Sequence, residues 1–159
     1  MTESSSPDAA VASLDPALLI LIVVGAHLRA EVADRPLGYR LRERILKWQD
    51  EQDETGETDQ STPRLQPIVC TDLWYLNAAE LAGRPAIAIG DPAVNAASAY
   101  FSSRLPSAFI IEGTLRVHLD SEFIERQAAL WGVTQAATAS AVDLFAERYL
   151  DEFMRAAVT

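Results

Sequence analysis

The sequence has few cysteines and histidines and no long apolar run. Cys70 is the only cysteine among 159 residues, so no disulfide can form within one chain. His27 and His118 are the only histidines, which argues against a structural zinc site. The longest apolar run, residues 18–25, is too short to span a bilayer, and the residues before it lack the basic start of a secretory signal. These features predict a cytoplasmic protein with no membrane partner.

Basic residues are also scarce relative to acidic ones. The chain carries 13 Lys and Arg against 23 Asp and Glu, a formal net charge of −10. Binding to a nucleic-acid backbone needs excess positive charge, so we expect no nucleic-acid partner. Hydrophobic residues make up 49% of the chain, which is typical of a folded protein, and the length favours one domain.

The most apolar stretch, residues 18–25, is rich in β-branched side chains and ends at Gly25. A continuous apolar run of this length is typical of a strand buried on both faces. A buried helix that starts at the Asp15–Pro16 pair and continues through Ala33 is the alternative. We favour the strand, because the run has no polar face.

The rest of the pattern alternates strands with helices. Strands are expected at residues 67–71, 86–89, 109–111, 115–119 and 127–131, and helices at residues 36–49, 77–81, 93–104 and 134–154. The last helix should be the longest, and Asn77 should cap the short one. The alternation predicts a three-layer, Rossmann-like α/β domain with a mainly parallel central sheet, and a hairpin around Gly113 makes the sheet mixed.

Two segments lack any periodic pattern. Residues 1–15 are acidic and rich in Ser and Ala, and we expect a disordered tail before a single domain at residues 16–159. Residues 50–66 are acidic and then rich in Thr, Ser and Pro, which predicts a flexible loop.

Polar residues follow several of the expected strands, where an α/β sheet forms its ligand crevice. His27, Glu31 and Asp72 are candidate catalytic groups, because a carboxylate beside an imidazole makes an acid–base pair. Asp34 is an alternative partner for His27, although a surface histidine explains the same pattern. The candidate ligand-binding residues are Arg29, Arg35, Asp91, Asn95, Trp131 and Thr134. We expect Arg29 and Asp72 to be surface residues whose replacement leaves stability nearly unchanged.

No motif identifies a cofactor. The segment after Gly25 has neither the GxGxxG fingerprint nor a GxxxxGK[ST] loop. The overall pattern resembles Rossmann-type α/β domains, without their diagnostic motifs. A magnesium site at Asp72, Asp91 and Asp120 is conceivable, but these aspartates serve equally well as helix caps, and we assign no metal. Cys70 lies in an apolar strand and is expected to be a core residue.

The sequence therefore predicts a domain that binds a small molecule, nucleotide-like or phosphorylated, at the carboxyl ends of its strands. The alternative is a non-catalytic module that binds a protein partner or forms a homo-oligomer. The missing nucleophile and phosphate loop favour the module, and the polar cluster after Gly25 favours the pocket.

Overall fold

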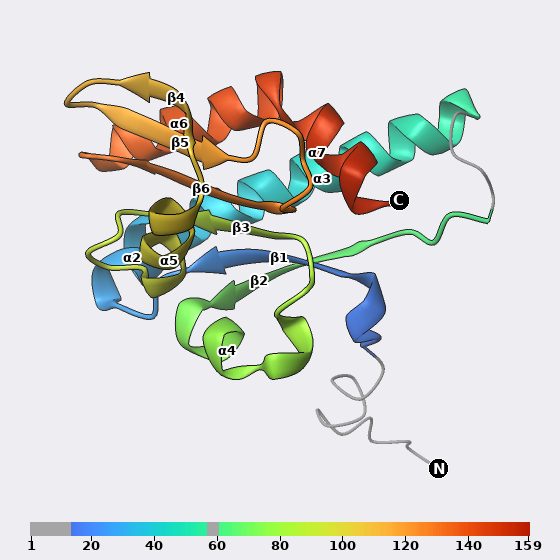
Figure 1. The fold of residues 1–159 in the computed structure, drawn as a ribbon, viewed down its shortest axis with the longest axis horizontal. Helices are drawn as coiled ribbons and strands as arrows, with labels where there is room; N and C mark the ends of the chain where they lie inside the picture. Colours follow the sequence, from blue (N-terminus) through green and yellow to red (C-terminus); the bar gives the residue numbers. More distant parts are fainter. Residues whose placement is uncertain (1–13, 57–60) are drawn as a thin grey trace, which may run out of the picture.

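A computed structural model describes residues 14–56 and 61–159. The chain forms an α/β fold around a six-stranded mixed sheet (Figure 1), with strand order β2-β1-β3-β6-β5-β4. The strands are β1 (Leu19–Val24), β2 (Gln66–Thr71), β3 (Ala86–Ile89), β4 (Ser107–Ile111), β5 (Leu115–Leu119) and β6 (Gln127–Gly132). Most of the expected tail, residues 1–13, lies outside the described residues.

Helices cover both faces of the sheet. The α-helices are α2 (Leu28–Ala33), α3 (Arg35–Thr55), α4 (Asp72–Asn77), α5 (Ala96–Arg104), α6 (Gln135–Arg148) and α7 (Leu150–Ala157). Two short 3₁₀ helices, Pro16–Leu18 and Ala79–Leu81, precede β1 and β3. Helices α3, α6 and α7 pack on one face, and α4 and α5 on the other.

The expected central strand is confirmed. All six residues of β1 are buried, and β1 pairs in parallel with β2 on one side and β3 on the other. Its alternate side chains feed two cores: Ile20, Ile22 and Val24 pack toward α3, while the residues between them pack toward α4 and α5. The alternative of a helix through Ala33 is wrong, and Asp15 caps only the 3₁₀ turn.

The sheet is parallel at its centre and antiparallel at one side. Strand β3 pairs in parallel with β6, and β5 pairs antiparallel with both β6 and β4. The expected hairpin is confirmed: Gly113 in the turn adopts φ 68°, a conformation that glycine accepts without strain. The carboxyl ends of β1, β2, β3 and β6 consequently lie on one edge of the sheet, near α2 (Figure 1).

Several helix boundaries differ from the expectation. Helix α3 continues through the acidic residues to Thr55, so the predicted loop is wrong for residues 50–55; residues 57–60 of that loop lie outside the described part. Helix α4 starts after Thr71, whose side chain accepts from the amide of Trp74, and Asn77 ends it. The expected long final helix divides at Tyr149, which leaves α3 the longest described helix.

Candidate functional site

A glycine at or just after the carboxyl end of each central parallel strand lets another part of the chain come close. A Cβ on Gly25 would lie 1.9 Å from the carbonyl oxygen of Val94, and one on Gly132 would lie 2.4 Å from the Cβ of Ala137. A Cβ on Gly90, whose φ is 121°, would lie 2.5 Å from a carboxylate oxygen of Asp34. The contacts at Gly25 and Gly90 bring the segment after β1 and the loop after β3 together, and the contact at Gly132 brings the start of α6 against the end of β6.

Asn95 fills the crevice between the ends of β1 and β3. Its amide nitrogen donates to the carbonyl oxygens of Val23 at 3.0 Å and Ile89 at 2.9 Å, and its oxygen caps α5 through the amide of Ser98. The residue is 1% exposed. Asn95, predicted to bind a ligand, therefore holds the two strand ends together and faces the interior.

Asp72 holds three backbone segments in place. Its carboxylate accepts from the amides of Ala26 at 2.9 Å, Leu73 at 2.8 Å and Ala96 at 2.7 Å. The side chain is buried, with 5% of the residue exposed. The expectation that Asp72 is a surface residue is wrong, because those amides draw its carboxylate inward to satisfy them.

A small cavity opens beside this crevice, on the side of β6. It has a volume of about 80 Å³ and lies between α2, the β3–α5 loop and the start of α6. Three predicted ligand-binding residues line it, Arg29, Asp91 and Thr134, together with Asp34 and Thr138. The cavity is roughly the size of one phosphate or carboxylate group.

Asp34 is the least expected residue of this cavity. It is 6% exposed, and within the described residues its carboxylate has no hydrogen-bond partner. Burial raises the pKa of Asp34 to about 6, the charge of Arg29 opposes this rise, and the charge of Asp91 adds to it. The sequence suggested Asp34 only as a partner for His27; its burial against Gly90 depends on tertiary packing that no local pattern encodes.

Arg29 and the start of α6 supply the positive side of the cavity. Arg29 is exposed and forms no ion pair with any described residue. Thr134 caps α6 by accepting from the amide of Ala137 at 3.1 Å. The first helical amides, those of Gln135 and Ala136, have no acceptor within the helix. A helix start with free amides attracts negative charge.

The expected pair of His27 with Glu31 does not form. The Nδ1 of His27 accepts from the amide of Arg29 at 3.1 Å and so caps α2. Glu31 binds Arg35 through two hydrogen bonds of 2.8 and 3.0 Å, and the bond from Arg35 lowers the pKa of Glu31. All three side chains therefore serve the α2 segment, beside the cavity but outside its lining.

Trp131 lies away from the cavity. By strand alternation it shares the α5 face of the sheet with Ala129. Its ring stacks on His118 with centroids 6.3 Å apart. Burial is the main cause that lowers the pKa of His118.

The conceivable magnesium triad is not assembled. Asp72 already accepts three amides, and Asp120 follows antiparallel β5, so it lies at the opposite edge of the sheet. Asp120 instead accepts from the amides of Glu122, Ile124 and Glu125, in the turn before β6. In the described part of the chain no group of three or more His, Cys, Asp or Glu side chains is arranged for a metal.

Cys70 is a core residue, as predicted. It is 7% exposed, and burial is the main cause that raises its pKa to about 12. A thiol with so high a pKa is protonated at neutral pH and unreactive.

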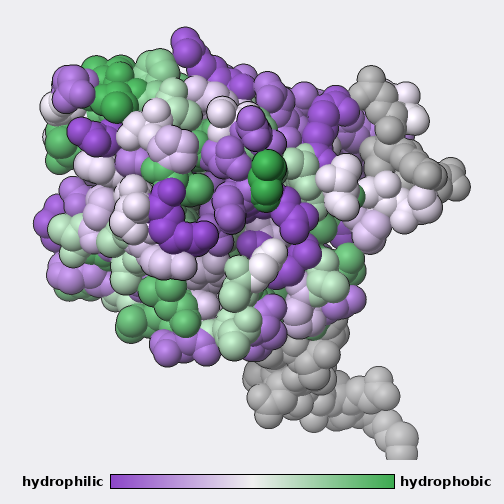
Figure 2. Space-filling view, in the orientation of Figure 1, coloured by the Kyte–Doolittle hydropathy of each residue, from purple (hydrophilic) through white to green (hydrophobic). Residues whose placement is uncertain are grey.

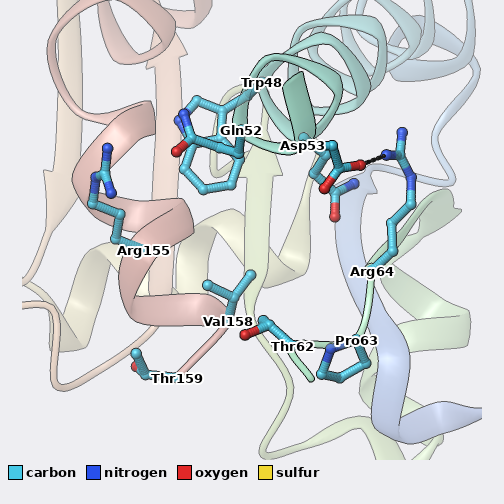
Figure 3. Close-up of a pocket in the computed structure, with 10 residues that line it drawn as sticks. Trp48, Gln52, Asp53, Thr62, Pro63, Arg64, Arg155, Val158 and Thr159 are labelled. Atoms are coloured by element: carbon cyan, nitrogen blue, oxygen red, sulfur yellow. Dashed lines mark hydrogen bonds and ion pairs between the residues drawn. The ribbon is translucent and has the colours of Figure 1, made fainter. Parts of the chain in front are cut away.

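A larger cavity, of about 300 Å³, lies at the opposite edge between α3, α7 and the segment before β2 (Figure 3). Its charged side chains pair with one another or with nearby groups: Arg64 binds Asp53 at 2.8 Å, and Arg155 binds Asp151 at 3.0 Å. The Trp48 indole also donates to Asp151, at 2.9 Å. These groups already have partners. The cavity therefore offers a ligand fewer unpaired polar groups than the small cavity at the carboxyl ends of the parallel strands.

Comparison with known proteins gives no functional guide. No family model, no curated protein and no solved structure matches the chain. Among the described helices, none combines the length and the apolar character needed to cross a membrane.

Proposed function

We propose that this chain is a Rossmann-like, three-layer domain that binds a small molecule in the cavity at the carboxyl edge. The carboxyl of Asp34 at the cavity is the observation that carries the proposal. The residue is 6% exposed and its carboxylate has no hydrogen-bond partner among the described residues, so the fold disfavours its charged form. Groups of this kind cluster at functional sites, where a ligand supplies the missing interaction.

The ligand class follows from the cavity's positive side. Arg29 and the free amides at the start of α6 suit a phosphate or another compact anion. Because the cavity admits roughly one such group, the rest of the ligand lies across the rim formed by α2 and the β3–α5 loop. A phosphorylated or nucleotide-like molecule fits this arrangement.

The proposal is for binding, because His27, Glu31 and Asp72 are already occupied by other contacts. His27 caps a helix, Glu31 pairs with Arg35, and Asp72 accepts three amides. Catalytic roles for these residues would require each contact to break.

Thermal unfolding in the presence of inorganic phosphate, a sugar phosphate and a nucleoside monophosphate tests the proposal. A ligand at about one hundred times its Kd stabilises the native state by about 2.7 kcal/mol, which raises the Tm of a domain this size by roughly 5–10 °C. Arg29→Ala should reduce that rise, whereas Arg44→Ala, at an exposed arginine of α3 outside the cavity, should not. Equal effects of the two variants, or no rise with any phosphate compound, would contradict the proposal.

One observation favours the alternative of an interaction module. Large apolar side chains on α2 and α4 are exposed near the same edge: Leu28, Val32, Leu73, Trp74 and Leu76. Figure 2 shows apolar surface over α4. Exposed apolar patches mark protein interfaces more often than the rest of a surface does.

A further inference from the structure

We propose that Asp34 and Asp91 hold a divalent cation of the Mg²⁺ type in the cavity at the carboxyl ends of the strands, and that this cation carries the ligand's phosphate at the rim of the cavity. The inference rests on the proposed function and adds the metal and the form in which the ligand binds. It starts from the mixed charge of the cavity lining. Arg29 and the start of α6 attract an anion, but Asp34 and Asp91 line the same cavity and their carboxylates would repel it.

A cation between the carboxylates removes this conflict. It would supply the hydrogen-bonding or ionic partner that the Asp34 carboxylate lacks among the described residues, in a residue that is only 6% exposed. The carboxylate lies against Gly90, where an added Cβ would be 2.5 Å from one of its oxygens, so any larger residue at position 90 would displace it. Asp91 keeps one oxygen on the amide of Ala93, at 2.8 Å, which orients its carboxylate as well.

The donor set favours Mg²⁺ over the other common metals. The cavity lining has oxygen donors and neither histidine nor cysteine, which argues against zinc and copper. Two carboxylates are fewer protein ligands than Ca²⁺ usually takes, whereas Mg²⁺ binds through one or two carboxylates, water and substrate phosphate.

The test is calorimetric titration of the whole chain with inorganic phosphate, in saturating Mg²⁺ and in EDTA, together with direct titration by Mn²⁺ followed by electron paramagnetic resonance. We expect phosphate to bind at least about tenfold more tightly with Mg²⁺, because the cation would bind both the carboxylates and the phosphate. Asp34→Asn and Asp91→Asn should each abolish this gain and the binding of Mn²⁺. Asp143→Asn, at an exposed aspartate of α6 outside the cavity, should change neither.

The possible failures are distinct. If phosphate binds equally well in EDTA, or if Asp34→Asn retains Mn²⁺, the cation site is wrong while the proposed function stands. If phosphate binds in neither condition and Mn²⁺ does not bind, both are wrong. If Mn²⁺ binds the wild type and the Asp143→Asn variant but phosphate binds neither, the phosphate-carrying role is wrong. Far-ultraviolet circular dichroism of each variant establishes that it is folded.

Discussion

Asp34 is a residue whose burial costs stability and so points to a function. The pKa of its carboxyl in the folded chain is about 6, above the ordinary value of 3.8. The native state therefore disfavours the charged form. Its cost is absent below about pH 4, grows as pH rises between the two values, and is complete above about pH 6.

The raised pKa of Asp34 predicts how Asp34→Asn changes stability. The variant cannot ionise, so at pH 7 we expect its free energy of unfolding to exceed that of the wild type by about 1–2 kcal/mol, a figure kept modest because the cavity leaves the carboxyl partly hydrated. The gain should vanish near pH 4. Urea unfolding of both proteins across this range measures it, and a gain that does not depend on pH would show that ionisation of Asp34 is not its source.

Asp72 is the opposite case, a buried carboxylate with all of its charge engaged. Asp72→Ala leaves three amides without their acceptor, and we expect a loss of about 2–4 kcal/mol in the free energy of unfolding. Asp72→Asn keeps one acceptor oxygen and should lose about half as much. Asp143→Ala, which breaks only an exposed ion pair with Arg40, is the control and should lose less than about 1 kcal/mol.

A result in which Asp72→Ala is as stable as the wild type would show that water replaces the carboxylate without cost. It would then return Asp72 to the group of candidate functional residues. These two aspartates show what residue type alone leaves undetermined. Asp34 directly precedes α3, and Asp72 directly follows β2, so both lie at the end of an element. Only the atoms around each carboxylate distinguish a structural role from a binding role.

At the scale of elements, the strands were easier to predict than the helix ends. Strands β1, β3 and β6 stand out in the sequence because they are short apolar runs closed by glycine. Helix ends depend on competition between nearby caps. Thr71 starts α4 six residues before the predicted cap, Asn77, and the polar residues after Gln49 continue α3 without an apolar stripe to mark them.

The break between α6 and α7 carries no local signal. The apolar positions Phe145, Leu150 and Phe153 continue across Tyr149, and neither glycine nor proline marks the division. Packing against the core determines the change of direction there, so periodicity predicted one helix where the structure has two.

The contact between Gly25 and Val94 gives a prediction at this scale. Gly25→Ala places a methyl group 1.9 Å from a backbone oxygen that belongs to another element. We expect a loss of at least about 2 kcal/mol, because the end of β1 and the β3–α5 loop must separate. Thermal and urea unfolding measure the loss.

Gly83→Ala is the matched control, since nothing lies within 4 Å of an added Cβ and the backbone there needs no positive φ. It should be neutral or stabilise by up to about 1 kcal/mol, through a less flexible unfolded chain. If the two variants have the same stability, the close packing at the carboxyl edge does not contribute to the fold as inferred.

At the scale of the whole molecule, the class of fold was predictable but the strand order was not. The alternation of elements indicates an α/β sheet, and the hairpin indicates that it is mixed. The order β2-β1-β3-β6-β5-β4 depends on which faces the helices cover. That order brings Arg29, Asp91 and Thr134 to one cavity, although they lie far apart in the sequence.

The same edge of the molecule carries both the cavity and the exposed apolar residues, so one comparison separates the two functions. Arg29 lines the cavity, whereas Leu73 is 59% exposed on α4 outside its lining. If the chain binds a small ligand, Arg29→Ala weakens phosphate binding and leaves the oligomeric state unchanged. Leu73→Asp then changes neither phosphate binding nor the oligomeric state. Both variants should unfold within about 0.5 kcal/mol of the wild type, because each replaces an exposed side chain. Calorimetry and light scattering after size exclusion measure the two properties. A wild type that self-associates and loses its association on Leu73→Asp, with no response to phosphate compounds, would favour the interaction module, because apolar contact would then be what this edge provides.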